Sequence, residues 1–523
     1  MKKHLILIFA VLLVISALFT SCDFNKKDPE PEPHECVAGT WVIASYPTDV
    51  TEGVKHKVCT ECGNILLKEA FPSSEGLAYQ LYNDSFYSVT GVGTCKDTDI
   101  VIPSTYNGLP VASIKNGAFN GYTAVGSITL GDRLVTIEAN AFRNCTSLSK
   151  VQFSDSLAYV EDGAFAGCSF LQDVYYNSDL EDWLNINFLG TTANPLCNGT
   201  NLYINNKLAT DIVIPNTIAN IPAYSFINCK SLTSLDIPDT VRRINDYAFA
   251  NCANLANVQL GNQSNSIGNY AFSNCVNLVE VVIPDNVRTL GNYAFHKCTS
   301  LEKFTFGDKL STVGEYTFAE CTSLRTLNLC DAIVKINNYA FNNCQSLEFI
   351  YYEGTADNWA MINFTDKSSN PMHLNKAKAY FGGQLVKNIV IEKATKVNAY
   401  AFYMCSSLES VVLGDSVTYV NNYAFQACPV LESATLNCNI GYGAFADCPY
   451  FESINLGVNV KSIGGYAFSN DTYLDKLTYA GTEAEWEAVS KAGGWNNKVS
   501  SYFEVTCTGV EPEIDPVTPA DAE

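Results

Sequence analysis

The segment NDYAFANCANLANVQLG at residues 245–261 decides the fold, because its pattern returns along most of the chain. A phenylalanine in the register of Phe249 occurs thirteen times, 23 residues apart except for two gaps of 61 and one of 20. A fixed period of this length is typical of a solenoid built from repeated coils. The thirteen positions are Phe119, Phe142, Phe165, Phe226, Phe249, Phe272, Phe295, Phe318, Phe341, Phe402, Phe425, Phe445 and Phe468.

One repeat contains a short strand, a turn and a compact return. In the stretch SLTSLDIP at 231–238, Leu235 and Ile237 are predicted to point inward while Ser234 and Asp236 point outward, as in a half-buried strand. The Tyr-Ala-Phe-x-x-Cys segment is predicted to form one helical or 3₁₀ turn with its Phe and Cys buried. A single unit cannot bury its own apolar stripe, so about fifteen coils should stack at roughly 4.8 Å each, on the order of 70 Å in all.

The Ala-Phe-x-x-Cys motif at 23-residue spacing covers about residues 75–480. This pattern resembles the BspA-type leucine-rich repeat family of bacterial surface proteins, and the stretch from Gly91 to Phe119 resembles the first repeat of that family. The resemblance implies a right-handed repeat solenoid, a leucine-rich-repeat arc with a parallel β-sheet on the concave side and short helical or 3₁₀ turns on the convex side. It also implies secretion and a part in adhesion or host contact.

A ladder of cysteines accompanies the phenylalanines. Eleven repeats carry a Cys three residues after the Phe, and we expect these thiols to fill small buried positions in the stack rather than to form disulfides or a metal stripe. The first and last repeats have Tyr122 and Asp471 there instead, and both are expected to face solvent at the ends of the array. The eleven are Cys145, Cys168, Cys229, Cys252, Cys275, Cys298, Cys321, Cys344, Cys405, Cys428 and Cys448.

Both 61-residue gaps hold a second kind of element. They share the motif Trp-x-x-Ile-Asn-Phe at Trp183 and Trp359, and a similar stretch follows the last repeat at Trp486. We predict a short amphipathic helix around each Trp, followed by a strand that rejoins the sheet at 211–215 and at 388–392. The Trp could project toward a ligand or pack the helix onto the solenoid, and a lone Trp in a helical stripe favours packing.

A small cysteine module precedes the repeats. His34, Cys36, Cys59 and Cys62 could ligate zinc, because Cys-x-x-Cys-Gly places two thiolates on one tight loop. The module resembles one found beside such repeats in secreted bacterial proteins, but lacks the further cysteine expected around 47–48. Structural zinc, a disulfide and structural thiols remain open, and no other cofactor is predicted.

The N-terminus resembles a bacterial lipoprotein signal. Lys2 and Lys3 precede an apolar run from Leu5 to Phe19, and Cys22 is the residue that would carry the lipid. The alternative is an ordinary secretory signal cut nearby. Either predicts export, and the lipid would make the chain a membrane-anchored lipoprotein of the cell surface. Loss of the two lysines changes the formal charge from −22 to −24, which argues against nucleic acid as a partner.

The sequence favours a binding or structural protein over an enzyme. Outside the signal and the cysteine module only His296, expected to face solvent, and His373 remain, and no nucleophile-elbow, zincin or phosphate-loop motif appears. We predict that the concave face binds a host or matrix protein, or a glycan; the alternative is a surface spacer or coat component without a specific ligand. The predicted ligand-binding residues are Ser234, Asp236, Asn257, Gln259, Glu280, Val282, Lys303, Thr305, Thr326 and Asn328.

These features divide the chain into six predicted regions. They are a signal peptide at 1–21, a spacer at 22–35, the Cys/His module at 36–74, the solenoid at 75–482 with Trp-bearing insertions at about 177–214 and 353–390, a Trp-bearing cap at 483–507 and an acidic tail at 508–523.

Overall fold

The computed structural model describes residues 35–374 and 377–509. Contacts within the chain divide it into two compact units. Of the described residues, the first holds 35–42 and Lys55–Glu69, and the second holds Ile43–Val54, 70–374 and 377–509. Among the described residues, no helix is both long enough and apolar enough to cross a membrane.

Most residues of the first unit lie in a three-stranded sheet in the order β1-β2-β3, with strands β1 (Ala38–Ser45), β2 (Gly53–Cys59) and β3 (Ile65–Phe71), whose ends extend into the second unit. The ammonium groups of Lys55 and Lys57 lie 5.0 and 5.4 Å from the ring centre of Trp41. Such cation–π contacts stabilise a small sheet that has little apolar interior of its own. The sulfur atoms of the cysteine module gather in this unit.

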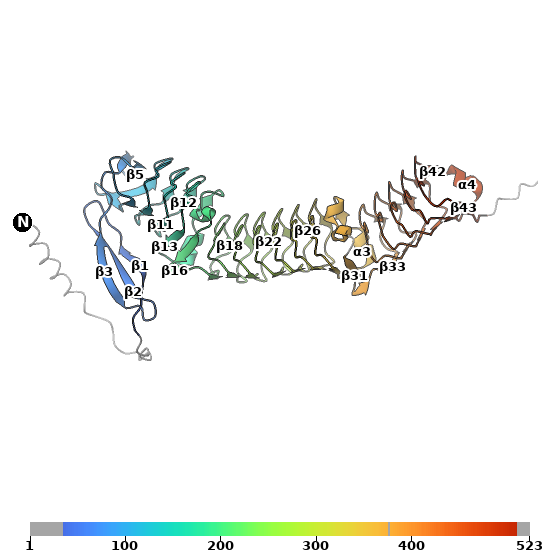
Figure 1. Cartoon of the computed structure of the whole chain (residues 1–523), viewed down its shortest axis with the longest axis horizontal. Coiled ribbons are helices and arrows are strands. Elements are labelled where there is room, and N and C mark those ends of the chain that lie inside the picture. Colours follow the sequence, from blue (N-terminus) through green and yellow to red (C-terminus); the bar gives the residue numbers. More distant parts are fainter. Residues whose placement is uncertain (1–34, 375–376, 510–523) are drawn as a thin grey trace, which may run out of the picture. The chain divides into compact units, whose positions relative to one another are not determined.

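The second unit is a parallel β-solenoid of about 17 turns, whose coils follow one another in chain order (Figure 1). This confirms the predicted repeat solenoid, with slightly more coils than the fifteen expected, because each Trp-bearing element completes a coil of its own. Each regular coil contributes one strand to a main sheet and a second, shorter strand to a side sheet, both in a 23-residue register such as Ser234 beside Asn257 and Arg243 beside Ser266.

The main sheet is divided into three blocks. The first block contains β6 (Asp99–Val101), β9 (Ser127–Thr129), β11 (Lys150–Phe153), β13 (Asp173–Tyr176), β15 (Asn201–Ile204) and β16 (Lys207–Leu208). The middle block contains β17 (Asp211–Val213), β19 (Ser234–Asp236), β21 (Asn257–Gln259), β23 (Glu280–Val282), β25 (Lys303–Thr305), β27 (Thr326–Leu329), β29 (Phe349–Tyr352), β31 (Lys378–Phe381) and β32 (Gln384–Leu385). The last block contains β33 (Asn388–Ile391), β35 (Ser410–Leu413), β37 (Ser433–Leu436), β39 (Ser453–Leu456), β41 (Lys476–Tyr479) and β43 (Glu504–Cys507).

The side sheet follows the same three blocks. Its strands in the first block are β4 (Ala78–Tyr82), β5 (Phe86–Gly91), β7 (Thr105–Tyr106), β8 (Leu109–Ile114), β10 (Thr136–Ile137), β12 (Tyr159–Glu161) and β14 (Asn187–Leu189). Those of the middle block are β18 (Asn220–Ile221), β20 (Arg243–Ile244), β22 (Ser266–Ile267), β24 (Thr289–Leu290), β26 (Thr312–Val313), β28 (Lys335–Ile336) and β30 (Asn363–Phe364). Those of the last block are β34 (Lys396–Val397), β36 (Tyr419–Val420), β38 (Asn439–Ile440), β40 (Ser462–Ile463) and β42 (Ser490–Lys491).

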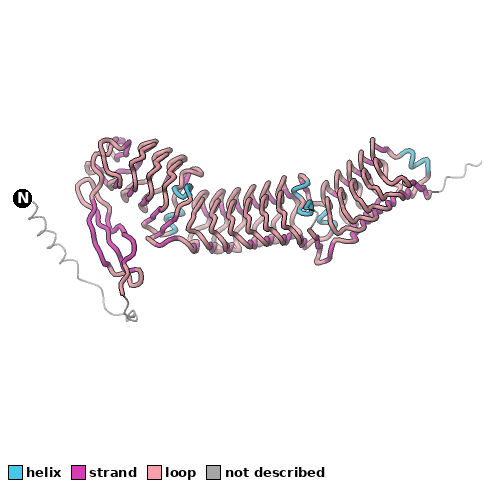
Figure 2. The backbone as a smooth tube through the Cα atoms, viewed as in Figure 1, coloured by secondary structure: helices cyan, strands magenta, loops and turns pink. Residues whose placement is uncertain are grey.

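The Trp-bearing elements close the blocks, and most of the helical residues lie there (Figure 2). The predicted helices are confirmed as α2 (Leu180–Leu184), α3 (Ala356–Ala360) and α4 (Glu483–Ala488). The 3₁₀ helix η1 (Pro195–Asn198) follows α2, and η2 (Lys367–Ser369) and η3 (Pro371–Leu374) follow α3. Strands form at both predicted places, as β17 and β33, and both pair with the coil that follows. They open the next block rather than rejoin the preceding one, which pairs instead with β15 and β31, each ending in a hairpin.

Stacked phenylalanines and cysteines form the core of the solenoid, as predicted. The ring of Phe272 lies 5.3 Å from that of Phe249 and 5.4 Å from that of Phe295, and all three are fully buried. The thiol of Cys275 donates a hydrogen bond to the carbonyl of Phe249, and the same bond recurs along the ladder. Burial raises the pKa of Cys275 well above its usual value, so the thiol stays protonated and inert.

The Tyr-Ala-Phe-x-x-Cys returns are not helical, contrary to prediction. Tyr247 and Asn251 have positive φ values of 58° and 61°, which no helix accepts. With this backbone conformation, the N–H groups of residues 247, 249 and 251 donate to carbonyls of the following coil, including Phe249 N to Ala271 O at 2.9 Å. Each return therefore continues the hydrogen-bonded stack, and the tyrosine rings stack outside it, 4.6 Å apart for Tyr247 and Tyr270.

The ends of the repeat array differ from expectation. Tyr122 is half-buried, and Asp471 is completely buried rather than solvent-facing. A further coil covers the last repeat, since Phe468 N donates to the carbonyl of Trp495. One carboxylate oxygen of Asp471 accepts a bond from Cys448 N at 2.8 Å, and the other has no hydrogen-bond partner among the described residues. This burial raises the pKa of Asp471 to about 9, so the carboxyl is protonated at neutral pH.

Replacing Asp471 with cysteine should stabilise the last block, increasingly so at higher pH. The folded state holds the Asp471 proton more tightly than the unfolded chain, in which the pKa is about 3.9. The stabilisation that comes from keeping the Asp471 carboxyl protonated is therefore complete below about pH 4 and is lost as the pH rises toward the folded pKa of about 9. We expect the stabilisation of the Asp471→Cys variant over the parent, measured by urea unfolding, to be more than about 1.4 kcal/mol larger at pH 8 than at pH 4. A difference between variant and parent that stays constant with pH would contradict this account.

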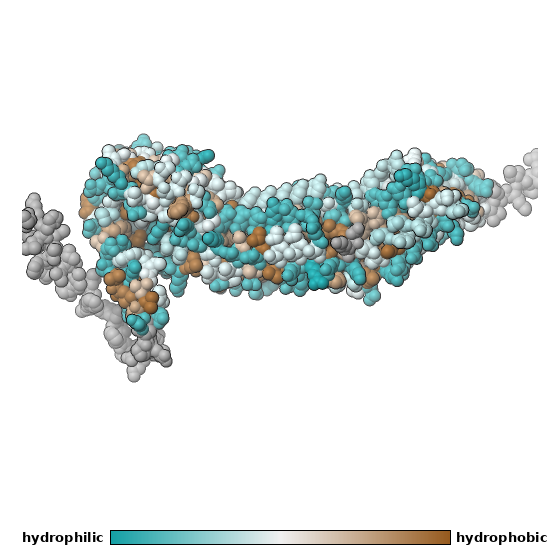
Figure 3. All heavy atoms as spheres, in the orientation of Figure 1, coloured by the Kyte–Doolittle hydropathy of each residue, from teal (hydrophilic) through white to brown (hydrophobic). Residues whose placement is uncertain are grey.

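The solenoid surface is mostly polar or neutral. On the face drawn in Figure 3, hydrophobic residues form small separate spots among hydrophilic and neutral ones. Exposed valines such as Val213 and Val282, which are 65% and 55% exposed, are outward residues of main-sheet strands. These strands therefore offer a mixed polar and apolar surface.

Candidate functional site

The predicted ligand-binding residues form two rows on the outer face of the main sheet. None is buried, and all ten lie on β19, β21, β23, β25 and β27. The strand register aligns them across neighbouring coils in a first row and a second row. The first row is Ser234, Asn257, Glu280, Lys303 and Thr326, and the second row is Asp236, Gln259, Val282, Thr305 and Asn328.

The rows are interrupted between β21 and β23. The three-stranded sheet β17-β19-β21 ends there and a six-stranded sheet begins at β23. The coil of β21 departs from the repeat, with a buried Ser264 where the neighbouring coils have Val241 and Val287, and with a half-exposed Val258 where they have a buried side chain. The return turns still join the two coils, through Phe272 N to Ala294 O at 2.9 Å. The main sheet therefore parts locally while the stack continues.

A hollow lies on the sheet beside this break. Its lining contains five of the ten predicted residues together with the exposed side chains of Asp211 and Val213. A second, smaller hollow continues along Gln259, Glu280 and Val282. The five predicted residues in the first hollow are Ser234, Asp236, Asn257, Gln259 and Glu280.

The polar groups of the hollow are partly committed and partly available. Ser234 and Thr210 donate hydrogen bonds to the carboxylate of Asp211, and these bonds lower its pKa. Among the residues that the structure describes, no side-chain hydrogen bond is made by Asp236, Asn257 or Gln259. One carboxylate and two amides are thus open to a ligand at a single place on the sheet.

Most polar side chains in the other half of the predicted set already have a side-chain partner. The ammonium group of Lys303 lies 2.7 Å from a carboxylate oxygen of Glu280, and Asn328 donates to the hydroxyl of Thr305 at 2.9 Å. Both contacts join neighbouring coils on the exposed face. Glu280 therefore joins the edge of the hollow to Lys303, whereas Asp236, Asn257 and Gln259 make no such contact in the described part of the chain, and these three make the hollow beside β21 the better candidate site.

Two tyrosine pairs on the outer face were missed in the sequence analysis. Tyr175 and Tyr203 stack at 4.3 Å between ring centres, and Tyr351 and Tyr380 at 5.1 Å, each pair at the last parallel strands of a block. The segments containing VYYN and IYYE carried the signal, because a period of two places the first Tyr of each outward when the second is buried. Tyrosine is enriched in binding surfaces, so these pairs extend the candidate face.

The tryptophans of the block-closing elements are packing residues. Trp183 and Trp359 are fully buried, and their indole N–H groups donate to the carbonyls of Ser225 and Ala401 at 3.1 and 2.6 Å. Both acceptors belong to the first coil of the next block. The interpretation of these residues as packing, rather than ligand-binding projections, is confirmed.

The side chain of His296 is less exposed than expected. It is half-buried, with one ring nitrogen 3.4 Å from a carboxylate oxygen of Glu320, and burial lowers its pKa. The ring of His373 in the insertion contacts the carbonyl of Asn370 at 2.7 Å. The two histidines lie in different coils of the array, and each is engaged with its own local partner.

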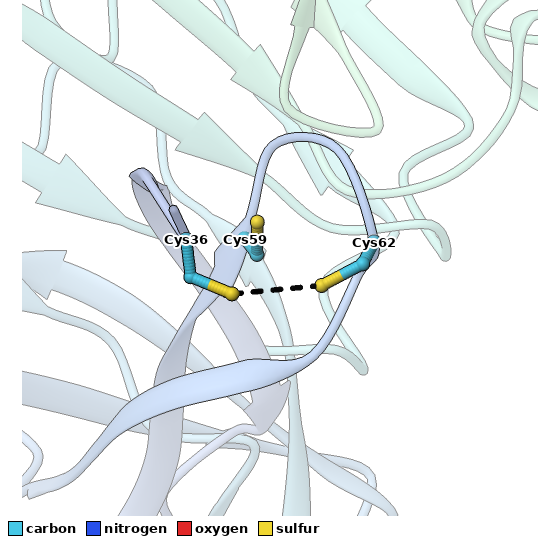
Figure 4. A group of neighbouring side chains, drawn as sticks. All are labelled: Cys36, Cys59 and Cys62. Carbon is cyan, nitrogen blue, oxygen red and sulfur yellow. Dashed lines mark hydrogen bonds between the residues drawn. The ribbon is translucent and has the colours of Figure 1, made fainter. Parts of the chain in front are cut away.

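The cysteine module brings three of its four predicted ligands together. The sulfur atoms of Cys36, Cys59 and Cys62 all lie within 4.8 Å of one another (Figure 4). The fourth predicted ligand, His34, and the predicted lipid-bearing Cys22 lie outside the described residues. The three sulfurs form the one cluster of metal-ligating type in the described part of the chain.

Comparison with known proteins identifies the family. The model of the BspA type leucine rich repeat region matches six copies, at residues 92–196, 198–284, 219–348 and 376–488. Among solved structures, a leucine-rich repeat protein from Bacteroides ovatus is similar at 20% identity and a TM-score of 0.48, covering 83% of this chain and 98% of that one. A leucine rich cell surface protein from Faecalibacterium prausnitzii is similar at 21% identity and a TM-score of 0.34, covering 80% and 97%. No curated protein matches. The chain belongs to the BspA-type leucine-rich repeat family.

Proposed function

We propose that this chain is an exported, non-enzymatic surface protein that attaches its cell to host or matrix material by binding a protein or a glycan. The observation that supports this most is the hollow beside β21, where five outward residues predicted from the repeat converge. Anchoring through a lipid on Cys22 is part of the proposal and would hold the solenoid at the membrane.

The chemistry of the hollow suits a ligand with many hydrogen-bonding groups. Asp236, Asn257 and Gln259 offer carboxylate and amide groups, while Val213 offers an apolar contact beside them. Such a mixture is typical of specific binding surfaces, which are about as apolar as the rest of a protein surface. The formal charge of −22 disfavours anionic ligands at long range, so the bound patch should be neutral or basic.

The double variant Asn257→Arg with Gln259→Arg tests the proposal. Both side chains are exposed on β21, so the fold should be retained while two bulky cations enter the hollow. We expect binding of the full chain to its ligand, identified on an array of glycans and matrix proteins, to weaken at least about tenfold, or about 1.4 kcal/mol. The thermal melt by circular dichroism should remain that of the parent.

A matched control places the same charges elsewhere on the outer face. Thr435 and Asn455 are exposed on β37 and β39 in the last block, and Thr435→Arg with Asn455→Arg should leave binding unchanged. Equal losses from the two double variants would indicate a nonspecific charge effect. Unchanged binding by both, or no ligand on the array, would favour a surface spacer without a specific ligand.

A further inference from the structure

The three cysteines of the first unit have the spacing of a metal centre. The sulfur atoms of Cys36 and Cys62 are 3.8 Å apart, and all three sulfurs fit within 4.8 Å. Zinc–sulfur bonds of about 2.3 Å in a tetrahedron place neighbouring sulfurs about 3.8 Å from one another. We propose that Cys36, Cys59 and Cys62 hold a structural zinc ion as thiolates.

The backbone builds this arrangement from two separate segments. Cys59 ends β2, and the turn that carries Cys62 closes with hydrogen bonds from Cys59 N to Asn64 O and from Gly63 N to Cys59 O. Gly63 has a φ of 71°, a conformation that favours glycine, and it allows the turn to bring Cys62 back toward Cys59. The two thiols therefore sit on one tight loop, as a zinc knuckle requires.

Cys36 reaches the same point because the chain before β1 is tied to the knuckle. Thr60 N, one residue after Cys59, donates a hydrogen bond of 3.0 Å to the carbonyl of Val37, one residue after Cys36. This bond places the third sulfur beside the other two (Figure 4). The convergence of the three thiols thus follows from main-chain bonding and not from side-chain rotation alone.

The donor set favours zinc over a disulfide. A disulfide joins two sulfurs and would leave the third thiol of the cluster outside the bond, whereas a metal ion can bind all three. Cys59 is buried while Cys36 is exposed, so the cluster has a closed side and an open side. Soft thiolate donors select zinc among the common divalent ions, and a three-thiolate site leaves a fourth position open to a further ligand. On binding, each thiol releases its proton to solvent and keeps its sulfur lone pair for the metal.

Zinc would also explain how so small a unit folds. The first unit holds three short strands and a thin apolar interior, and sheets of this size usually need a metal or a cross-link. Removing the metal should therefore unfold the first unit and leave the solenoid intact. This inference does not depend on the proposed adhesion.

The test is the metal content and cobalt spectrum of the purified full chain. We expect one zinc per chain, lost in Cys62→Ser and retained in Cys62→His, which offers an imidazole nitrogen in place of the thiolate. The controls Cys507→Ser and His56→Ala should keep their zinc, because neither residue belongs to the cluster. Cobalt in place of zinc should give the charge-transfer absorption of thiolate ligands and the visible bands of a tetrahedral ion. A chelator should expose the first unit to protease while the solenoid resists.

Two results would overturn the proposal. One is full zinc content in Cys62→Ser. The other is a chain without metal whose peptide map shows a disulfide between two of the three cysteines. The cobalt spectrum of the unaltered chain keeps the test decisive even where a variant fails to fold.

Discussion

Replacing Trp359 with alanine is expected to cost about 3–5 kcal/mol of unfolding free energy, the usual loss for a fully buried aromatic side chain. The indole packs against Tyr352, Phe364 and Phe381, with ring centres 5.1 to 5.4 Å apart. Its N–H donates to the carbonyl of Ala401 in the next block, where the main sheet itself is interrupted. Urea unfolding followed by circular dichroism would measure the loss.

Two further variants separate packing from hydrogen bonding. Trp359→Phe removes the bond to Ala401 and part of the buried ring, while the Ala401 carbonyl still accepts a bond from the Asn370 amide, so it should cost about 1–3 kcal/mol. Trp486→Ala removes a less buried indole at the end of the array and should cost less than Trp359→Ala. If Trp359→Phe cost as much as Trp359→Ala, the hydrogen bond rather than packing would dominate at this position.

Phe272→Ala should cost a similar amount, about 3–5 kcal/mol, because the ring is sandwiched between Phe249 and Phe295 in the middle block. In a repeat array each coil contacts only its neighbours, so the damage should concentrate in the adjoining coils. Hydrogen exchange should show the amides nearest residue 272 losing protection first.

The same change at Phe468 is the comparison. That ring is equally buried, but fewer coils lie beyond it. Phe468→Ala should therefore release only the end of the last block and lower the overall melt less than Phe272→Ala. Equal or reversed effects on the two melts would contradict the nearest-neighbour account of the stack.

The periodic parts of the fold were predictable because one physical requirement repeats in them. Phe272, Cys275 and Leu278 recur every 23 residues, since every coil must bury the same stripe against identical neighbours. The outward positions followed from strand alternation, which placed Asn257 and Gln259 correctly. The packing role of Trp183 and Trp359 followed from their place in a helical stripe.

The remaining features depend on individual residues and coils that depart from the repeat pattern. Asp471 was expected at an exposed end, but Trp495 belongs to a covering coil that lacks the repeat motif. The helical prediction for the returns failed because Tyr247 adopts a positive φ, which is uncommon outside glycine and asparagine. The break beside β21 occurs in a coil that has Ser264 where its neighbours have valine, and only the structure shows that the strands part there.

The direction of the coil-to-coil hydrogen bonds has a mechanical consequence. They run along the solenoid axis, so tension between a membrane anchor and a bound surface would load the coil interfaces in series. When interfaces are loaded in series, the weakest one determines the force that the array withstands. The main sheet is interrupted at three interfaces, which lie after β16, between β21 and β23, and after β32. Two of these are bridged by buried indoles, to Ser225 and Ala401. The third has no such bridge among the described residues, but its side sheet stays paired through β22 and β24 and its return hydrogen bonds continue. The interfaces after β16 and β32, where both sheets are interrupted, therefore depend most on their buried indoles.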